Sequence, residues 1–213
     1  FRLGTKKSLE TARKLELECM EFADVAGEFA VEELSNSQLS GLLSMFERHG
    51  IAVSSVCGDF KENGKWSPGF THEHNIEERI IWTKKMMDTA RKLKSSIVQT
   101  HIGVIPEDSE AKEWKLMKYA LDILGEYGER TGCCIATETG PESPATMKRF
   151  LDTLKHKTVK ANYDPANLVM AGYDQLGGVK ILGEYIAHTH AKDGKRGNGE
   201  VPLGDGDVNF PEY

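Results

Sequence analysis

The chain has 213 residues, of which 39% are hydrophobic and 28% charged, so it can bury one sizeable core and is not disordered by composition. Its 27 Lys and Arg and 33 Asp and Glu give a net charge of −6, which argues against a general binder of nucleic acids or anionic membranes. It contains no apolar run of about 18 residues and no N-terminal signal-peptide core. We therefore predict a cytoplasmic protein with neither a nucleic-acid nor a membrane partner.

The chain starts with FRLGT (1–5), which we expect to be the tail of a strand. A predicted helix over 8–18 follows, with Ser8 as its N-cap, and a short apolar run near 20–25 predicts a strand. Cys19 precedes this run. It and the other three cysteines match no zinc-binding spacing, so we expect four buried, reduced thiols: Cys19, Cys57, Cys133 and Cys134.

An amphipathic helix is predicted over 35–49, with Ser35 or Ser37 as its N-cap and Gly50 after its last turn. The β-branched residues that follow predict a strand at 51–56.

Residues 58–75 are rich in Gly, Asn, Pro and His and predict a loop. We expect its run His72-Glu73-His74 to be solvated, because it lacks the helical spacing of a zinc-binding motif. Trp66 and Phe70 lie in this loop, and Trp66 has two interpretations: it covers a small polar substrate, or it packs into the core.

The rest of the chain continues the same alternation. Further helices are predicted over 76–93, 110–132, 143–154 and 175–183, and further strands over 96–101, 134–138, 159–164 and 185–190. The final residues 210–213 look like the opening of another helix.

This alternation predicts an α/β fold with parallel strands, in a single domain over 1–213. A doubly wound nucleotide-binding sheet is the alternative, but neither GxGxxG nor GxxxxGK[ST] occurs. We favour a (β/α)₈ barrel, which usually needs about 250 residues. The expected barrel is therefore truncated at both ends, with a partial first strand and no eighth strand, and we expect the physical protein to be longer than 213 residues.

Ionisable residues stand at the ends of the last four predicted strands: His101, Glu138, Asp164 and the pair His188 and His190. The strand ends of a barrel meet at one mouth, where catalytic groups gather. The intervals from Glu138 to Asp164 and from Asp164 to His190 are both 26 residues, which predicts the same position in successive βα units.

Two carboxylates and an imidazole suit Mn²⁺, Co²⁺, Mg²⁺, Fe²⁺ or Zn²⁺. Each residue also has a plainer interpretation: His101 as a satisfied polar group, and Asp164 before Pro165 as a turn residue or helix cap. Glu138 ends an apolar run, where a buried carboxylate needs a partner.

The chain resembles the xylose isomerase-like TIM-barrel superfamily, which includes sugar isomerases, tagatose/psicose 3-epimerases and, more distantly, endonuclease IV. The resemblance is carried by HIG (101–103), TETG (137–140), NYDPANL (162–168), HTHAKD (188–193) and VPLGDGDVNF (201–210). It covers most of the second half of the chain, and it identifies the superfamily but no substrate.

The resemblance implies one divalent metal ion held by Glu138, Asp164 and His190, with Mn²⁺ expected first and Co²⁺, Mg²⁺ and Zn²⁺ as alternatives. The fourth ligand of the family, a Glu on the eighth strand, has no position here, since Glu212 comes too early. The implied substrate-binding residues are His101, Asn167, His188, Lys192 and Arg196, and Asp193 completes a polar pair with Lys192. Asn167 stands where many relatives have His.

The implied activity is that of an isomerase: a metal-dependent sugar or sugar-phosphate isomerase or epimerase, acting by proton transfer through a cis-enediolate with Glu138 as one acid/base. Its partner would be a small ketose or sugar phosphate, and barrels of this type often form homo-oligomers. A lyase or dehydratase acting on a keto-sugar or inosose, including the C-glycoside-cleaving type, stays open, as does a non-catalytic sugar-binding relic. A DNA-repair nuclease is disfavoured by the negative charge and by Asn167.

Overall fold

The computed structural model describes residues 3–23, 34–59, 61–62, 65–66 and 68–213. The central strands are β1 (Cys19–Phe22), β2 (Ala52–Cys57), β5 (Ile97–Thr100), β6 (Cys134–Glu138), β7 (Val159–Tyr163) and β8 (Ile186–Thr189). The α-helices are α1 (Thr5–Lys14), α2 (Asn36–His49), α3 (Ile76–Lys92), α4 (Lys112–Thr131), α5 (Pro144–Asp152), α6 (Pro165–Met170) and α7 (Gln175–Leu182), and a 3₁₀ turn covers Gly183–Tyr185.

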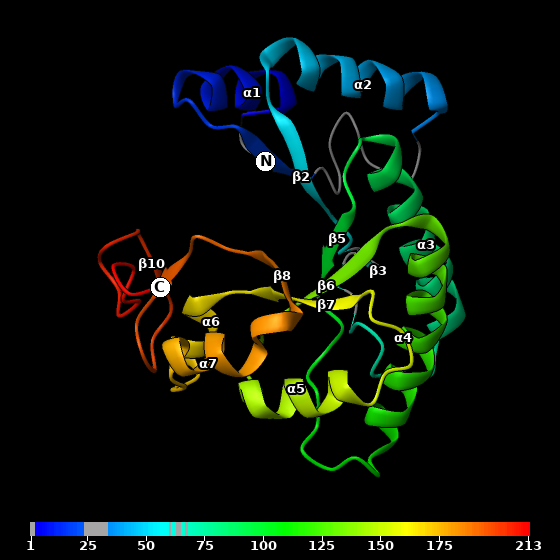
Figure 1. Cartoon of the computed structure of the whole chain (residues 1–213), viewed down its shortest axis with the longest axis vertical. Helices are drawn as coiled ribbons and strands as arrows, with labels where there is room; N and C mark the ends of the chain where they lie inside the picture. The colour runs from blue at the N-terminus through cyan, green and yellow to red at the C-terminus, as the bar shows by residue number, and fades with distance from the viewer. Residues whose placement is uncertain (1–2, 24–33, 60, 63–64, 67) are drawn as a thin grey trace.

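The six central strands form one parallel sheet in the order β1-β2-β5-β6-β7-β8, so each strand lies beside the next one along the chain. A doubly wound sheet would reverse its strand order at one point, and this sheet does not. The helices follow one another around the outside of the sheet (Figure 1). The predicted architecture is confirmed: the six strands are part of a TIM barrel.

The start of the chain differs from the prediction. Thr5 already belongs to α1, whose N-cap is Gly4 and not Ser8, so the described part of FRLGT is not a strand. Phe1 and Arg2 lie outside the described residues, as do Asp24 and Val25 at the end of the predicted strand 20–25.

The second predicted helix is confirmed with its caps. The Ser35 hydroxyl accepts a hydrogen bond from the Gln38 N–H, and the Gln38 side chain accepts one from the Ser35 N–H, which is a capping box. Gly50 ends the helix with φ 67°, a left-handed conformation that glycine adopts without strain. Leu39, Leu42 and Phe46 are its buried residues.

Several small elements were not predicted. They are helix α6 and two short antiparallel pairs, β3 (Lys61–Glu62) with β4 (Lys65–Trp66) and β9 (Asp193–Gly194) with β10 (Glu200–Val201). The last residues, 210–213, form a turn and not a helix. Elements of two to six residues carry too little periodicity to be recognised in a sequence.

The four cysteines are free, but they are not all buried. Cys133 is buried, Cys57 and Cys134 are half-buried and Cys19 is exposed at the start of β1. The pattern of strand faces explains the error, because β1 forms one edge of the sheet and its first residue points out of the core.

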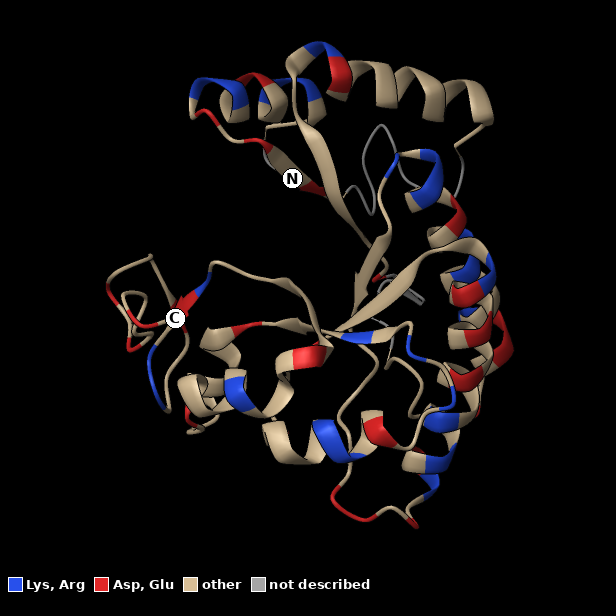
Figure 2. Cartoon of the chain, in the orientation of Figure 1, with Lys and Arg blue, Asp and Glu red and all other residues tan. Residues whose placement is uncertain are grey.

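The core lies between the sheet and its helices. Trp114 of α4 packs edge-to-face on Phe150 of α5, with ring centroids 4.9 Å apart, and both are buried. Phe70 is also buried in the core, whereas the side chain of Trp66, which has the two interpretations, lies outside the described part. Acidic and basic residues alternate along the outer helices α3 and α4 (Figure 2). In the described part of the chain no helix is long and apolar enough to cross a membrane.

Candidate metal centre

The sheet register brings polar side chains from three strands into one row. Glu138 of β6 pairs with Asn162 of β7, and Asn162 pairs with His188 of β8. Paired residues of parallel neighbours point to the same face, so all three belong to one face at the C-terminal ends of the strands. Asp164 and His190 follow directly after β7 and β8.

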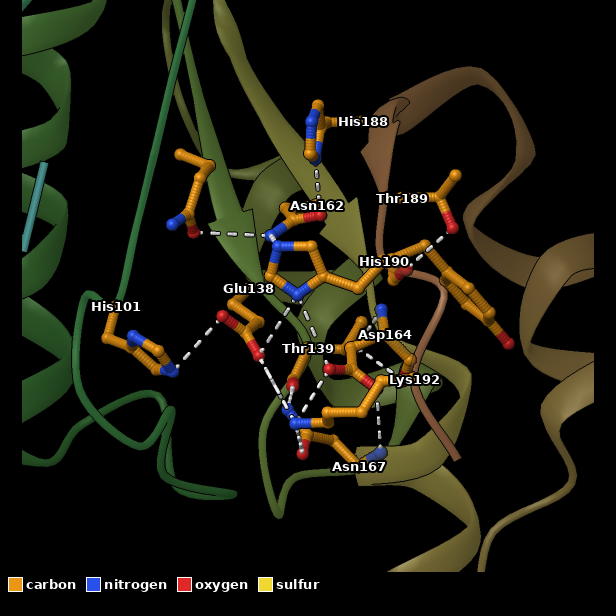
Figure 3. A network of polar contacts seen from close by, with 12 residues as sticks. His101, Glu138, Thr139, Asn162, Asp164, Asn167, His188, Thr189, His190 and Lys192 are labelled. Carbon is orange, nitrogen blue, oxygen red and sulfur yellow. Dashed lines mark hydrogen bonds and ion pairs between the residues drawn. The ribbon is translucent and has the colours of Figure 1, made fainter. Parts of the chain in front are cut away.

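Glu138, Asp164 and His190 converge at this edge, as the 26-residue spacing predicts (Figure 3). One ligand atom from each lies within 4.8 Å of the other two. His190 Nδ1 is 3.4 Å from Asp164 Oδ2 and 3.6 Å from Glu138 Oε1. Asp164 is fully buried and Glu138 is 7% exposed, so both carboxylates require positive partners.

The ionisation of these groups follows from their contacts. Hydrogen bonds to Asp164 and Glu138 raise the pKa of His190 to about 10. Burial acts to raise the pKa of Asp164, but hydrogen bonds from His190 and Lys192 hold it below its ordinary value. At neutral pH the metal-free cluster therefore contains an imidazolium, and a cation that binds Nδ1 must displace its proton.

Asp164 also caps a helix, which confirms the plainer interpretation of this residue. Its Oδ1 accepts the backbone N–H of Asn167 at the start of α6. Its Oδ2 alone is directed toward His190 and Lys192. The helix cap thus leaves one oxygen of Asp164 for a cation.

His101 connects Glu138 to a carboxylate that the sequence did not single out. Its Nε2 lies 3.2 Å from Glu138 Oε2, and its Nδ1 lies 2.7 Å from Asp59 Oδ2. The hydrogen bond with Asp59 raises the pKa of His101. Asp59 follows strand β2 as the other site residues follow theirs, but it was assigned to the predicted loop 58–75. Its position after a strand was the signal that could have found it.

Asn167 and Lys192 lie beside the two carboxylates. Asn167 Nδ2 donates to Glu138 Oε1 and to Thr139 O, both at 2.8 Å. Lys192 Nζ donates to Asn167 Oδ1 and to Asp164 Oδ2, also at 2.8 Å.

Arg196 is in a different position. It is exposed, and its guanidinium donates to Gly172 O at 3.1 Å. Within the described residues, no hydrogen bond or ion pair connects Arg196 with Glu138, Asp164 or His190.

A chain of polar contacts lies on the other side of His190. Ser55 Oγ donates to Glu21 Oε2 (2.8 Å) and contacts His188 Nε2 (3.1 Å). His188 Nδ1 donates to Asn162 Oδ1 (2.9 Å), Asn162 Nδ2 donates to Gln99 Oε1 (3.2 Å), and Gln99 Nε2 returns to Glu21 Oε1 (3.3 Å). These side chains are polar, whereas branched apolar residues usually fill the interior of a barrel.

Glu21 was missed by the sequence analysis. It forms a second candidate ligand group with His188 and His190, and its Oε2 lies 4.0 Å from His190 Nε2. Burial raises the pKa of Glu21 and lowers that of His188. Glu21 is an acidic residue in the middle of the apolar run Met20-Glu21-Phe22, and this position in the sequence could have identified it as a candidate site residue.

The donor set fits a hard or borderline divalent cation, because it offers two carboxylate oxygens and one imidazole nitrogen. The ammonium of Lys192 already stands beside the same carboxylate oxygens, which shows that the site accepts positive charge.

A family model described as a xylose isomerase-like TIM barrel matches residues 9–213. No curated protein sequence matches the chain. Among solved structures, a xylose isomerase domain protein from Planctomyces limnophilus is similar, with a TM-score of 0.84 and 22% identity over 96% of this chain and 79% of that one.

Two further structures are similar over 98% of this chain. A D-tagatose 3-epimerase-like protein has a TM-score of 0.80 and 18% identity over 80% of its own length. The probable 3-DHS dehydratase AsbF from Bacillus anthracis, involved in petrobactin synthesis, has a TM-score of 0.76 and 16% identity over 81% of its length. At such identities the similarity establishes the fold alone.

Proposed function

The chain belongs to the xylose isomerase-like TIM-barrel family, and we propose that it is a divalent-metal-dependent isomerase or epimerase of a ketose or ketose phosphate. The observation that carries the proposal is the convergence of Glu138, Asp164 and His190 at the C-terminal ends of successive barrel strands. A D-tagatose 3-epimerase-like protein among the similar structures supports the choice of sugar epimerisation.

Glu138, Asp164 and His190 would hold the metal ion. A divalent cation held there would supply Lewis-acid polarisation of a substrate carbonyl and would favour the loss of a proton from the neighbouring carbon. We expect Mn²⁺ first. One similar structure from Mycobacterium smegmatis is in complex with magnesium, and one of an IOLI protein has a zinc atom, which supports a divalent ion without selecting among them.

Glu138 is the proposed catalytic acid/base. His101 Nε2 holds its Oε2, while Asn167 and the facing His190 hold its Oε1, so the carboxylate keeps one orientation. Asp59 in turn orients His101, as the third member of a hydrogen-bonded chain.

Hydroxyl groups of a sugar need donors and acceptors around the reacting carbon. Lys192 and Asn167 lie next to the ligand oxygens, and His188 is fixed by Asn162, so these three are the proposed substrate-binding residues near the metal. Arg196 would bind the far end of a longer substrate or a phosphate only after its side chain leaves Gly172 O.

Solvent deuterium exchange tests the proposal without knowledge of the product. The protein is loaded with Mn²⁺ in D₂O and given free ketoses and ketose phosphates, and NMR detects deuterium on the carbon beside the carbonyl. We expect the Glu138→Gln variant to exchange at least about 10²-fold more slowly, since a positioned acid/base contributes about 10²–10⁴ in rate.

The exposed Glu184→Gln variant is the matched control and should exchange at the wild-type rate. Exchange by Glu138→Gln at the wild-type rate contradicts the assigned role.

A dehydratase is the second candidate, because the dehydratase AsbF is also among the similar structures. Such an enzyme removes the same kind of proton and then expels water. The two candidates differ in their products: an epimer has the mass of its substrate, whereas a dehydration product is lighter by one water and absorbs ultraviolet light as an enone.

A further inference from the structure

Lys192 is a second positive charge inside the cluster of carboxylates, in addition to His190. Its Nζ lies 2.8 Å from Asp164 Oδ2 and 3.9 Å from Glu138 Oε1. Its side chain is only 26% exposed, and it points toward the two carboxylates (Figure 3). Lys192 and His190 thus approach the same two carboxylates.

The oxygens that Lys192 contacts are the ones that a metal ion needs. Asp164 Oδ1 is taken by the N–H of Asn167, and Glu138 Oε2 is taken by His101. The oxygens that face the cations are therefore Oδ2 of Asp164 and Oε1 of Glu138, and Oε1 keeps a lone pair for a cation beside the hydrogen bond that it accepts from Asn167. His190 Nδ1 faces the same two oxygens.

A divalent ion bound to these oxygens would lie within about 5 Å of the ammonium as it now stands, because metal–oxygen bonds are about 2.0–2.6 Å long. Two like charges at this separation repel strongly in a partly buried site. While the ammonium stays at Asp164 Oδ2, it therefore weakens the binding of a metal ion to the same oxygen.

We propose that Lys192 stands in for the divalent cation in the metal-free chain and is released from Asp164 when the cation binds. This inference rests on the proposed metal site and adds a metal-controlled substrate-binding group to it.

Lys192 has a second acceptor at the mouth of the site. Glu200 Oε1 of strand β10 lies 3.2 Å from Nζ, and its side chain is 66% exposed. The flexible four-carbon stem of lysine allows the ammonium to turn toward Glu200 when Asp164 is occupied by metal. The released ammonium then faces solvent, where it can bind a hydroxyl or phosphate of the substrate.

Metal affinity tests the competition directly. Mn²⁺ binding is measured by calorimetry for the wild type and for the Lys192→Met and Lys192→Arg variants, with circular dichroism to confirm that each is folded. We expect Lys192→Met to bind Mn²⁺ at least about ten-fold more tightly, because it keeps the length of the side chain and removes the charge. Lys192→Arg keeps the charge and should stay within about three-fold of the wild type.

Amine labelling tests the movement. Lys192 is acetylated with acetic anhydride with and without Mn²⁺, and mass spectrometry gives its rate relative to Lys7, an exposed lysine of α1. We expect Mn²⁺ to raise the relative rate at Lys192 several-fold, and to do so less in Asp164→Asn, which lacks a metal ligand.

The outcomes separate this inference from the proposed function. If neither the wild type nor Lys192→Met binds Mn²⁺, Mg²⁺ or Zn²⁺, the metal site is wrong and both proposals fail. If the wild type binds metal but Lys192→Met binds no more tightly, or if metal protects Lys192 from acetylation, the metal site stands and the release of Lys192 is refuted.

Discussion

Asp193 organises the loop that follows the metal-binding segment. Its buried carboxylate accepts four backbone N–H groups: those of Gly194 (2.8 Å), Gly204 (2.9 Å), Gly206 (3.0 Å) and Val208 (3.2 Å). Gly194 and Val208 are buried, whereas Gly204 is exposed and Gly206 half-buried. The carboxylate therefore joins residues far apart in the loop next to Lys192.

We predict that Asp193→Ala lowers the free energy of unfolding by about 2–6 kcal/mol. The two buried N–H groups lose their acceptor at about 1–3 kcal/mol each, while water replaces the carboxylate at the other two. Asp193→Asn should lie between Asp193→Ala and the wild type, because its remaining oxygen can accept the buried pair through Oδ1. The exposed Asp205→Asn, in the same loop, is the control and should change stability by less than about 0.5 kcal/mol.

Urea unfolding followed by circular dichroism measures these differences, and hydrogen exchange at Gly206 and Val208 reports whether the loop alone opens. Burial acts to raise the pKa of Asp193, but the four N–H groups hold it below its ordinary value. The stabilisation by the Asp193 carboxylate is therefore complete above the pKa of Asp in the unfolded chain, near 3.9, and is lost as the pH falls through the lower pKa of the folded protein. Two results would refute the reasoning. One is an Asp193→Ala variant that is as stable as the wild type at pH 7 and has unchanged hydrogen exchange. The other is a difference in the free energy of unfolding between this variant and the wild type that grows on acidification.

Two further predictions concern packing and ionisation. A Cβ at Gly178 in α7 would collide with the Tyr163 hydroxyl, so Gly178→Ala should destabilise the protein by about 1–3 kcal/mol. A Cβ at Gly41 in α2 meets open space, so Gly41→Ala should stabilise the protein by about 0.5–1 kcal/mol. Urea unfolding compares the two variants, and equal changes in their free energies of unfolding would contradict this packing. Asp59→Asn removes the hydrogen-bonded charge that raises the pKa of His101. NMR titration of the metal-free protein should therefore give a lower pKa for His101 in this variant. An unchanged pKa would mean that Asp59 does not set the pKa of His101.

The sequence by itself determined the succession of the longer helices and strands and pointed to three residues of the candidate site. Ser35 and Gln38 form their capping box through local hydrogen bonds, and such contacts are readable along the chain. Glu138, Asp164 and His190 were recognisable because equal spacing in successive βα units places side chains at equivalent strand ends.

Only the tertiary structure decided which polar groups share the barrel interior. Glu21 meets Ser55 and Gln99, which lie 34 and 78 residues further along the chain, and Asp59 meets His101 across 42 residues. These contacts depend on the register of strands β1, β2 and β5 and on the curvature of the sheet, which no local pattern specifies. The same holds for Lys192, whose position between Asp164 and Glu200 depends on helix α6, which Asp164 caps, lying against strand β9.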